Sequence, residues 1–182
     1  MKATGIVRRI DDLGRVVIPK EIRRTMRIRE GDPLEIFTDK EGEVILKKYS
    51  PIGELGDFAS QYAETLAKTS GHVICITDKD AVIAVSGAPK KDFVEKRVSV
   101  DLEKMMQEKT NFVAKGGEER KIAVIDGGDT RYTTGVVAPI IAEGDPIGSV
   151  IFLSTDPNVN MGEVETKLAQ SAAGFLGKQL EQ

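Results

Sequence analysis

Residues 4–24 constrain the fold of this 182-residue chain more than any other stretch, because apolar and cationic residues alternate there on both sides of a tight turn. Residues 4–10 alternate with a period of two, as in a strand with two different faces. Residues 11–14, Asp-Asp-Leu-Gly, are a turn signal, and residues 15–18 are mostly β-branched and extended. Pro19 keeps the preceding residue out of the helical region and suits the first position of a helix. We therefore expect two strands joined by a turn, followed by a short helix.

A second hairpin is expected after the helix, with strands over residues 34–37 and 43–47 and a turn at 39–42. The first fifty residues thus form the pattern strand, turn, strand, short helix, strand, turn, strand. A unit of this size has difficulty closing a hydrophobic core alone. We therefore expect an obligate dimer, in which a second copy covers the two apolar hairpins.

The positive charge of the chain is concentrated at its N-terminal end. Residues 1–29 hold nine lysines and arginines against three acidic residues, a net +6, so the remainder carries −9 to give −3 overall. One interpretation is a solvated surface. Arginine, however, combines phosphate contact with bidentate recognition of guanine edges, which favours nucleic acid as the partner. A helix-turn-helix needs a packed pair of helices, so a β-ribbon or loop reader fits this segment better.

Residues 1–50 resemble the swapped-hairpin DNA-binding domain of the AbrB family of bacterial transition-state regulators. The resemblance is carried by residues 1–9, 12–19 and 22–24, and farther on by 34–36 and 45–49. It implies an interleaved homodimer on double-stranded DNA. The DNA contacts that it implies fall on Arg8, Arg15, Arg23 and Arg24, with Arg9 and Lys2 as additional phosphate contacts. Shorter antitoxins share this fold, so an antitoxin remains an alternative.

The composition is that of an ordinary globular protein, with 40% apolar and 30% charged residues. No apolar run is long enough to span a bilayer and no signal-peptide core opens the chain, so we expect a cytoplasmic protein without membrane contact. The sole cysteine, Cys75, and the sole histidine, His72, are expected to be structural, and they offer no disulfide and no multi-histidine metal site. No nucleophile–base motif occurs. We therefore expect no enzyme, no catalytic residue and no metal.

A second domain is expected after residues 50–53, Ser-Pro-Ile-Gly, which break the pattern. The predicted division is a DNA-binding domain over 1–50, a linker over 51–55 and a second domain over 56–182. This domain is expected to begin with a helix over 54–68 and to end with one over 161–180, each with an apolar stripe. The stripes fit core packing, or pairing of the two helices with a partner chain's copies in a bundle.

Between these helices the pattern is α+β. Two hairpins are expected, one over 72–77 and 81–86 and one over 135–142 and 147–154, with a strand over 120–125 and helices over 92–95 and 101–109. The continuous apolar character of the later hairpin indicates a central, well-buried sheet. We expect an antiparallel sheet with helices at one side.

The ending of this pattern, an apolar strand, a Gly-Asp-Pro turn, an Ile-Gly-Ser-Val strand and a long helix over residues 139–180, resembles a GAF domain. GAF domains commonly bind small molecules or proteins. The combination of both modules resembles a family of forespore transcription regulators of spore-forming bacteria. It implies a homotetramer held by the C-terminal helices, DNA binding that activates and represses sporulation genes, and an unidentified small-molecule ligand, with a pocket between the sheet and the loops around 78–80 and 110–130. A ligand-free scaffold is the alternative.

Overall fold

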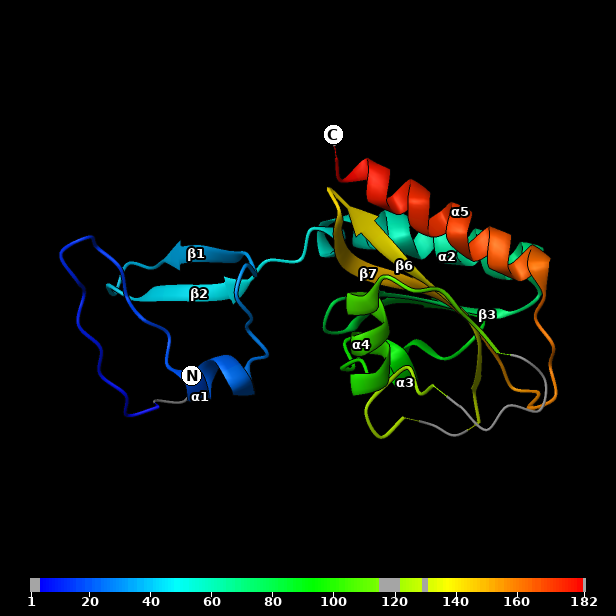
Figure 1. Cartoon of the computed structure of the whole chain (residues 1–182), viewed down its shortest axis with the longest axis horizontal. Helices are drawn as coiled ribbons and strands as arrows, with labels where there is room; N and C mark the ends of the chain where they lie inside the picture. Colours follow the sequence, from blue (N-terminus) through cyan, green and yellow to red (C-terminus); the bar gives the residue numbers. More distant parts are fainter. Residues whose placement is uncertain (1–3, 115–121, 129–130, 182) are drawn as a thin grey trace. The chain divides into compact units, whose positions relative to one another are not determined.

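Two units make up the chain in the computed structural model, Met1–Tyr49 and Ser50–Gln182 (Figure 1). The structure describes residues 4–114, 122–128 and 131–181. At the junction of the units, the 3₁₀ helix η1 (Ile52–Leu55) follows Pro51. Ile52 is fully buried in the core of the second unit, whereas Gly53 and Glu54 beside it are exposed.

The first unit contains the helix α1 (Lys20–Thr25) and an antiparallel hairpin of β1 (Leu34–Thr38) and β2 (Val44–Lys48). These elements confirm the expected short helix and second hairpin. The strands expected over residues 4–10 and 15–18 are wrong for the single chain, which has no regular secondary structure there. A strand needs a neighbour to satisfy its backbone, and within the described residues of one chain no strand lies beside these segments.

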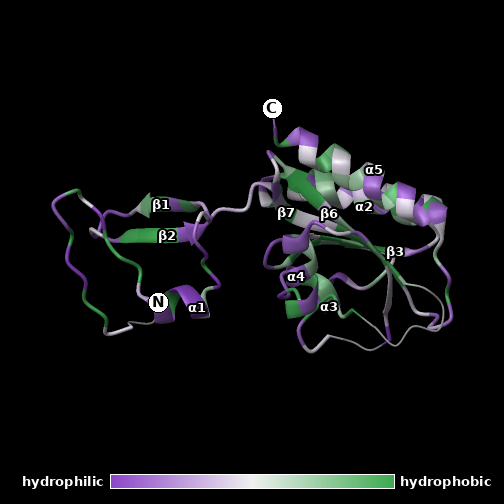
Figure 2. Ribbon diagram, in the orientation of Figure 1, coloured by the Kyte–Doolittle hydropathy of each residue, from purple (hydrophilic) through white to green (hydrophobic). Residues whose placement is uncertain are grey.

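Apolar side chains of the first unit remain largely exposed. Val7 is 87% exposed, Ile10 70% and Val44 68%, and among residues 4–49 the buried class contains Pro19 alone. Figure 2 shows the hydrophobic colour along β2 and in stretches of the chain that precedes α1. So much exposed apolar surface on so small a unit is typical of an interaction surface.

The second unit is built on a five-stranded antiparallel sheet in the order β4-β3-β7-β6-β5 (Figure 1). Its strands are β3 (Val73–Asp78), β4 (Val82–Ser86), β5 (Phe112–Val113), β6 (Thr133–Ala142) and β7 (Asp145–Ser154). Its helices are α2 (Gly56–Ser70), α3 (Lys90–Phe93), α4 (Val100–Glu108) and α5 (Glu163–Gln179). The α+β class with an antiparallel sheet is thereby confirmed.

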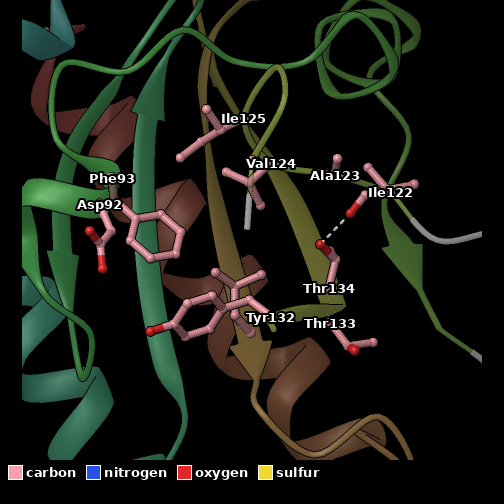
Figure 3. Close-up of a pocket in the computed structure, with 11 residues that line it drawn as sticks. Asp92, Phe93, Ile122, Ala123, Val124, Ile125, Tyr132, Thr133 and Thr134 are labelled. Carbon is pink, nitrogen blue, oxygen red and sulfur yellow. Dashed lines mark hydrogen bonds between the residues drawn. The ribbon is translucent and has the colours of Figure 1, made fainter. Parts of the chain in front are cut away.

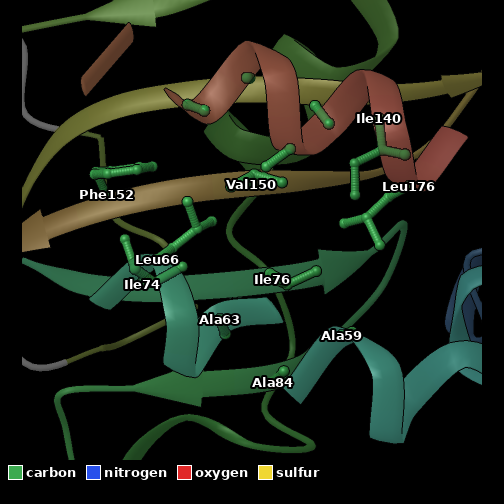
Figure 4. Packing of buried hydrophobic residues seen from close by; sticks show 14 of the residues in the cluster. Ala59, Ala63, Leu66, Ile74, Ile76, Ala84, Ile140, Val150, Phe152 and Leu176 are labelled. Atoms are coloured by element: carbon green, nitrogen blue, oxygen red, sulfur yellow. The ribbon is translucent and has the colours of Figure 1, made fainter. Parts of the chain in front are cut away.

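Helices cover both faces of this sheet, so the expectation of helices at one side is wrong. The helices α2 and α5 pack on one face, where Ile74, Ile76 and Phe152 meet Leu66 and Leu176 (Figure 4). The helices α3 and α4 pack on the other face. Because successive side chains of a strand point to opposite faces, β3 can bury apolar residues on each side only if both faces are covered.

Two further expectations concern β3 and the loops. Cys75 is a core residue as expected, since it is fully buried, and burial raises the pKa of its thiol well above the ordinary value. A strand over 120–125 is wrong for its described part. Residues 122–125 hold only an isolated bridge between Ile125 and Val98, and residues 120 and 121 lie outside the described residues.

Candidate nucleic-acid interface

The arginines implied as DNA contacts lie on three segments of the first unit, and all of them are exposed. Arg8 and Arg9 lie on the segment 4–10, Arg15 follows the turn at 11–14, and the last two, Arg23 and Arg24, lie on α1. Lys2, the remaining residue of the expected set, lies outside the described residues. The structure therefore brings together Arg23 and Arg24 on one helix and places the others on the chain that leads to it.

Local sequence explains why α1 ends where it does. Arg23 and Arg24 occupy the last turn, where cations are stabilised by the helix dipole. The amide of Ile28 donates to the Arg23 carbonyl (2.7 Å), and Arg27 takes a left-handed conformation with φ of 51°. The ammonium of Lys48 in β2 donates to the Arg27 carbonyl (3.0 Å). The helix that carries two candidate contacts is thus joined to the hairpin.

The turn before Arg15 is organised by one carboxylate. Asp11 Oδ1 accepts from the amides of Leu13 (3.0 Å) and Arg15 (2.8 Å), and Oδ2 accepts from Arg15 Nε (2.8 Å). Gly14 supplies the positive φ, 75°, that the turn requires. The hydrogen bonds donated by Arg15, first from its backbone amide and second from its side chain, lower the pKa of Asp11. Sequence analysis did not single out Asp11, although the Asp-x-x-Gly-x spacing recurs at residues 39–43.

A cavity of about 230 Å³ lies in the second unit beside the face of the sheet that α3 and α4 cover (Figure 3). Its wall is apolar and aromatic, with Phe93 and Tyr132 in edge contact at 5.0 Å between ring centroids. The other described residues that line it are Asp92, Ile122, Ala123, Val124, Ile125, Gly128, Thr133, Thr134 and Leu153. Of the two loops expected to line a pocket, the cavity touches 122–128 and not 78–80. Its residues are far apart in the sequence, so no local pattern predicts them.

Hydroxyl groups hold the loop wall of this cavity in place. Thr134 Oγ1 donates to the Ile122 carbonyl (2.5 Å) and Ser99 Oγ donates to the Ala123 carbonyl (2.5 Å). The amide of Ser99 donates to the Val124 carbonyl (2.9 Å). The segment 122–125 is therefore fixed to β6 and to the start of α4 by a few hydrogen bonds rather than by a continuous strand ladder.

Within residues 4–114, 122–128 and 131–181, no three histidine, cysteine or acidic side chains gather as a metal site would require. No helix in the same ranges has the length and apolar character that crossing a bilayer requires.

Two protein families match the chain. The family described as stage V sporulation protein T C-terminal, transcription factor, matches residues 54–181. The family described as antidote-toxin recognition MazE, bacterial antitoxin, matches residues 7–54.

The chain is 57% identical to stage V sporulation protein T of Bacillus subtilis over 182 residues, which is the full length of both. It is 65% identical over 51 residues to the transition state regulatory protein AbrB of the same organism, which covers 28% of this chain and 52% of AbrB. The GAF domain of a phosphoenolpyruvate-protein phosphotransferase from Coxiella burnetii aligns with a TM-score of 0.56 at 11% identity, over 69% of this chain and 82% of that one. This last likeness shows a GAF-like fold.

Proposed function

The chain belongs to the stage V sporulation protein T family of DNA-binding transcription regulators of sporulation, and we propose that it binds double-stranded DNA through paired copies of its first unit. We propose that the DNA contacts are Arg8, Arg15, Arg23 and Arg24, with Arg9 and Lys2 on phosphates. The carrying observation is that the five described arginines of this set are exposed on a unit whose first 29 residues have a net charge of +6. In this proposal the protein both activates and represses genes, has no catalytic role, and acts at the nucleoid in the forespore cytoplasm.

The first unit works as a homodimer in this proposal. Support comes from its exposed apolar side chains, Val7, Ile10 and Val17 before α1 and Ile36 and Val44 in the hairpin. A second copy that pairs with residues 4–10 and 15–18 would satisfy their backbone groups and cover these side chains in one step.

The second unit joins two such dimers into a tetramer in this proposal. Support comes from an aromatic cluster of Phe58 and Tyr62 on α2 with Phe175 on α5, whose ring centroids lie 5.8–6.3 Å apart. Phe58 is 37% exposed and Phe175 42% exposed. Exposed aromatic rings on two neighbouring helices are suited to contact between copies.

An antitoxin is the weaker reading. The antitoxin family covers residues 7–54, whereas the alignment with the sporulation regulator spans the full length of the chain. An antitoxin function would also leave the folded second unit without a purpose.

The DNA proposal is tested with single alanine substitutions of Arg8, Arg15, Arg23 and Arg24 in the full chain. We expect each to weaken binding to a duplex selected by the wild-type protein, with the oligomeric state unchanged by light scattering. Binding should fall steeply with salt, and the loss of one phosphate contact should reduce the slope of log K against log salt by about one. Unchanged affinity in all four variants would refute the assignment, and Arg131→Ala in the second unit is the control for a general loss of positive charge.

We propose, second, that the cavity of the second unit holds a small regulatory molecule. Its volume of about 230 Å³ lies below the range of roughly 300–1,000 Å³ typical of pockets for drug-sized ligands. Its aromatic and aliphatic wall favours a largely apolar metabolite. The polar groups at its edge, Asp92 and Thr133, would orient that molecule.

This ligand proposal is tested by thermal-shift screening of the full chain against small apolar metabolites. We expect a compound that raises the melting temperature of the wild type and not that of Val124→Phe, in which a larger side chain fills the cavity. Compounds that stabilise both proteins equally bind elsewhere. Absence of any cavity-dependent compound would favour a ligand-free scaffold.

A further inference from the structure

Two turns of the first unit are built in the same way. In residues 11–15 and 39–43 an aspartate comes first and a glycine fourth. Asp39 Oδ1 accepts from the amides of Glu41 (3.0 Å) and Glu43 (2.8 Å), as Asp11 Oδ1 does from Leu13 and Arg15. Each aspartate amide also donates to the carbonyl of the fifth residue, at 3.0 Å in the first turn and 3.2 Å in the second.

The turns differ in what the second carboxylate oxygen does. At the first turn Asp11 Oδ2 lies 2.8 Å from Arg15 Nε. At the second turn the corresponding side chain is Glu43, which carries the same charge as Asp39 and cannot form this pair. The second turn therefore shows that this backbone geometry needs only the first oxygen. The contact between Asp11 Oδ2 and Arg15 is an addition to the turn.

Stability is a poor explanation for this addition. The Asp11 side chain is 36% exposed and that of Arg15 68% exposed, and ion pairs so open to water contribute little to folding. A carboxylate beside a phosphate backbone also repels it. An aspartate at this place in a DNA interface therefore needs a compensating role.

Geometry supplies such a role. A guanidinium has five N–H donors in a rigid plane, and the bond from Nε uses one of them. The two terminal nitrogens keep their donors for an acceptor on DNA, and they present the paired donors that match a phosphate or a guanine edge. Fixing the plane before binding also removes part of the entropy that a flexible arginine loses on contact.

We propose that Asp11 is a positioning residue, which orients the guanidinium of Arg15 for DNA through its second carboxylate oxygen. This inference rests on the proposed DNA contact of Arg15. The proposal predicts opposite effects on DNA binding for the adjacent carboxylates of Asp11 and Asp12. Asp11 holds Arg15, whereas Asp12 forms no hydrogen bond or ion pair with the described part of the chain. Asp12 should only repel DNA, whereas Asp11 should assist it.

The experiment compares Asp11→Asn, Asp12→Asn and Asp39→Asn in the full chain, on a duplex selected by the wild-type protein from random sequence. Asparagine retains a carbonyl oxygen for the turn amides and loses the charge that holds Arg15. We expect Asp11→Asn to bind about threefold to tenfold more weakly, from renewed freedom of one arginine per copy. We expect Asp12→Asn and Asp39→Asn to bind as tightly as wild type or more tightly. Equal affinities for Asp11→Asn and Asp12→Asn would overturn the proposal.

Arg15 variants separate positioning from folding. Asp11→Asn should cost no affinity in an Arg15→Ala background, and a cost that persists there would show that Asp11 acts through the turn alone. Arg15→Lys leaves Asp11 and the turn intact but lacks the guanidinium plane, so it should also weaken binding. Wild-type affinity of Arg15→Lys would overturn the proposal even if Asp11→Asn does not fold. No effect of Arg15→Ala would instead refute the DNA contact itself.

Discussion

Glu165 shows how one acidic side chain can hold the start of a helix. Its Oε2 accepts from the amide of Gly162 (2.8 Å), and its Oε1 lies 3.6 Å from Nε2 of His72, the residue before β3. Its own amide, the Gly162 amide and then the charge of His72 hold the pKa of the Glu165 carboxyl below the ordinary value of 4.5. His72, expected to be structural, thus contacts the helix α5.

We expect Glu165→Gln to flatten the acid side of the stability profile. A carboxyl whose pKa is lowered in the folded state stabilises it above the ordinary pKa, and this contribution is lost as the pH falls through the lowered value. The wild type should therefore lose stability below about pH 4.5 through this group, and the variant should not. At neutral pH the variant should lose about 1 kcal/mol, as when a helix cap is weakened. Thermal unfolding between acid and neutral pH measures both effects.

The control is Glu163→Gln on the same helix, since the Glu163 side chain is 78% exposed and forms a surface ion pair with Lys167. It should leave the profile close to that of wild type. Identical acid profiles for Glu165→Gln and wild type would contradict the assignment.

At the scale of elements, α5 packs on β6 through a glycine. A Cβ on Gly177 would lie 2.1 Å from the carbonyl oxygen of Ile141, a backbone atom that cannot move without disturbing the sheet. A Cβ on Gly174, one turn earlier, would meet nothing within 4 Å. Close packing on β6 therefore leaves no room for a side chain at Gly177, whereas Gly174 has room for one.

We expect Gly177→Ala and Gly174→Ala to have opposite effects on unfolding. The first forces α5 away from β6 and should destabilise the second unit by about 1–3 kcal/mol, as overpacking does. The second replaces glycine in an open helical position and should stabilise by about 0.5–1 kcal/mol. Urea unfolding of the full chain, monitored by helix content, measures both changes. A similar effect of both substitutions would show that the close approach does not limit the packing.

Sequence patterns predicted the long helices and the hairpins whose two strands are close together in the chain. The long helices and three of the four expected hairpins follow from periodicity and turn residues, because both halves of each element are local. The segments 4–10 and 15–18 alternate as a strand does but form no strand in the single chain. Alternation predicts that one face is buried, and it does not say which molecule covers that face. The two-sided packing of the sheet was missed although helices were expected over 92–95 and 101–109, because a local pattern does not say which face of a sheet a helix covers.

The sequence proposes the residues of the candidate interface, and the structure adds the geometry around them. Arginines at 8, 15, 23 and 24 are visible from charge and from resemblance to a family. The contact of Asp11 with Arg15 required coordinates, because an aspartate in a turn signal already has a sufficient local explanation. The cavity residues, from Asp92 to Leu153, come together only through the sheet order.

At the scale of the whole molecule, we expect a fragment ending at Tyr49 to bind DNA more weakly than the full chain. In the proposed tetramer the second unit links two DNA-binding dimers of the first unit. Binding of one dimer to DNA therefore raises the effective concentration of the other at a nearby site. The fragment should remain dimeric and should lose affinity mainly on a duplex with two sites. Affinity measured on one-site and two-site duplexes of equal length checks this. Equal binding of fragment and full chain to the two-site duplex would leave the tetramer without a role in binding.

The exposed apolar residues of the first unit have a consequence for the amount of protein that a cell must make. If Val7, Ile10 and Val44 are buried only against a second copy, the folding of the first unit requires two chains to meet. The concentration of the folded dimer of first units then varies with the square of the chain concentration when chains are scarce. At such low concentrations, a twofold rise in synthesis would give about a fourfold rise in the assembled dimer. The amount of assembled DNA-binding unit would therefore respond more steeply than the amount of chain made, before any DNA is bound.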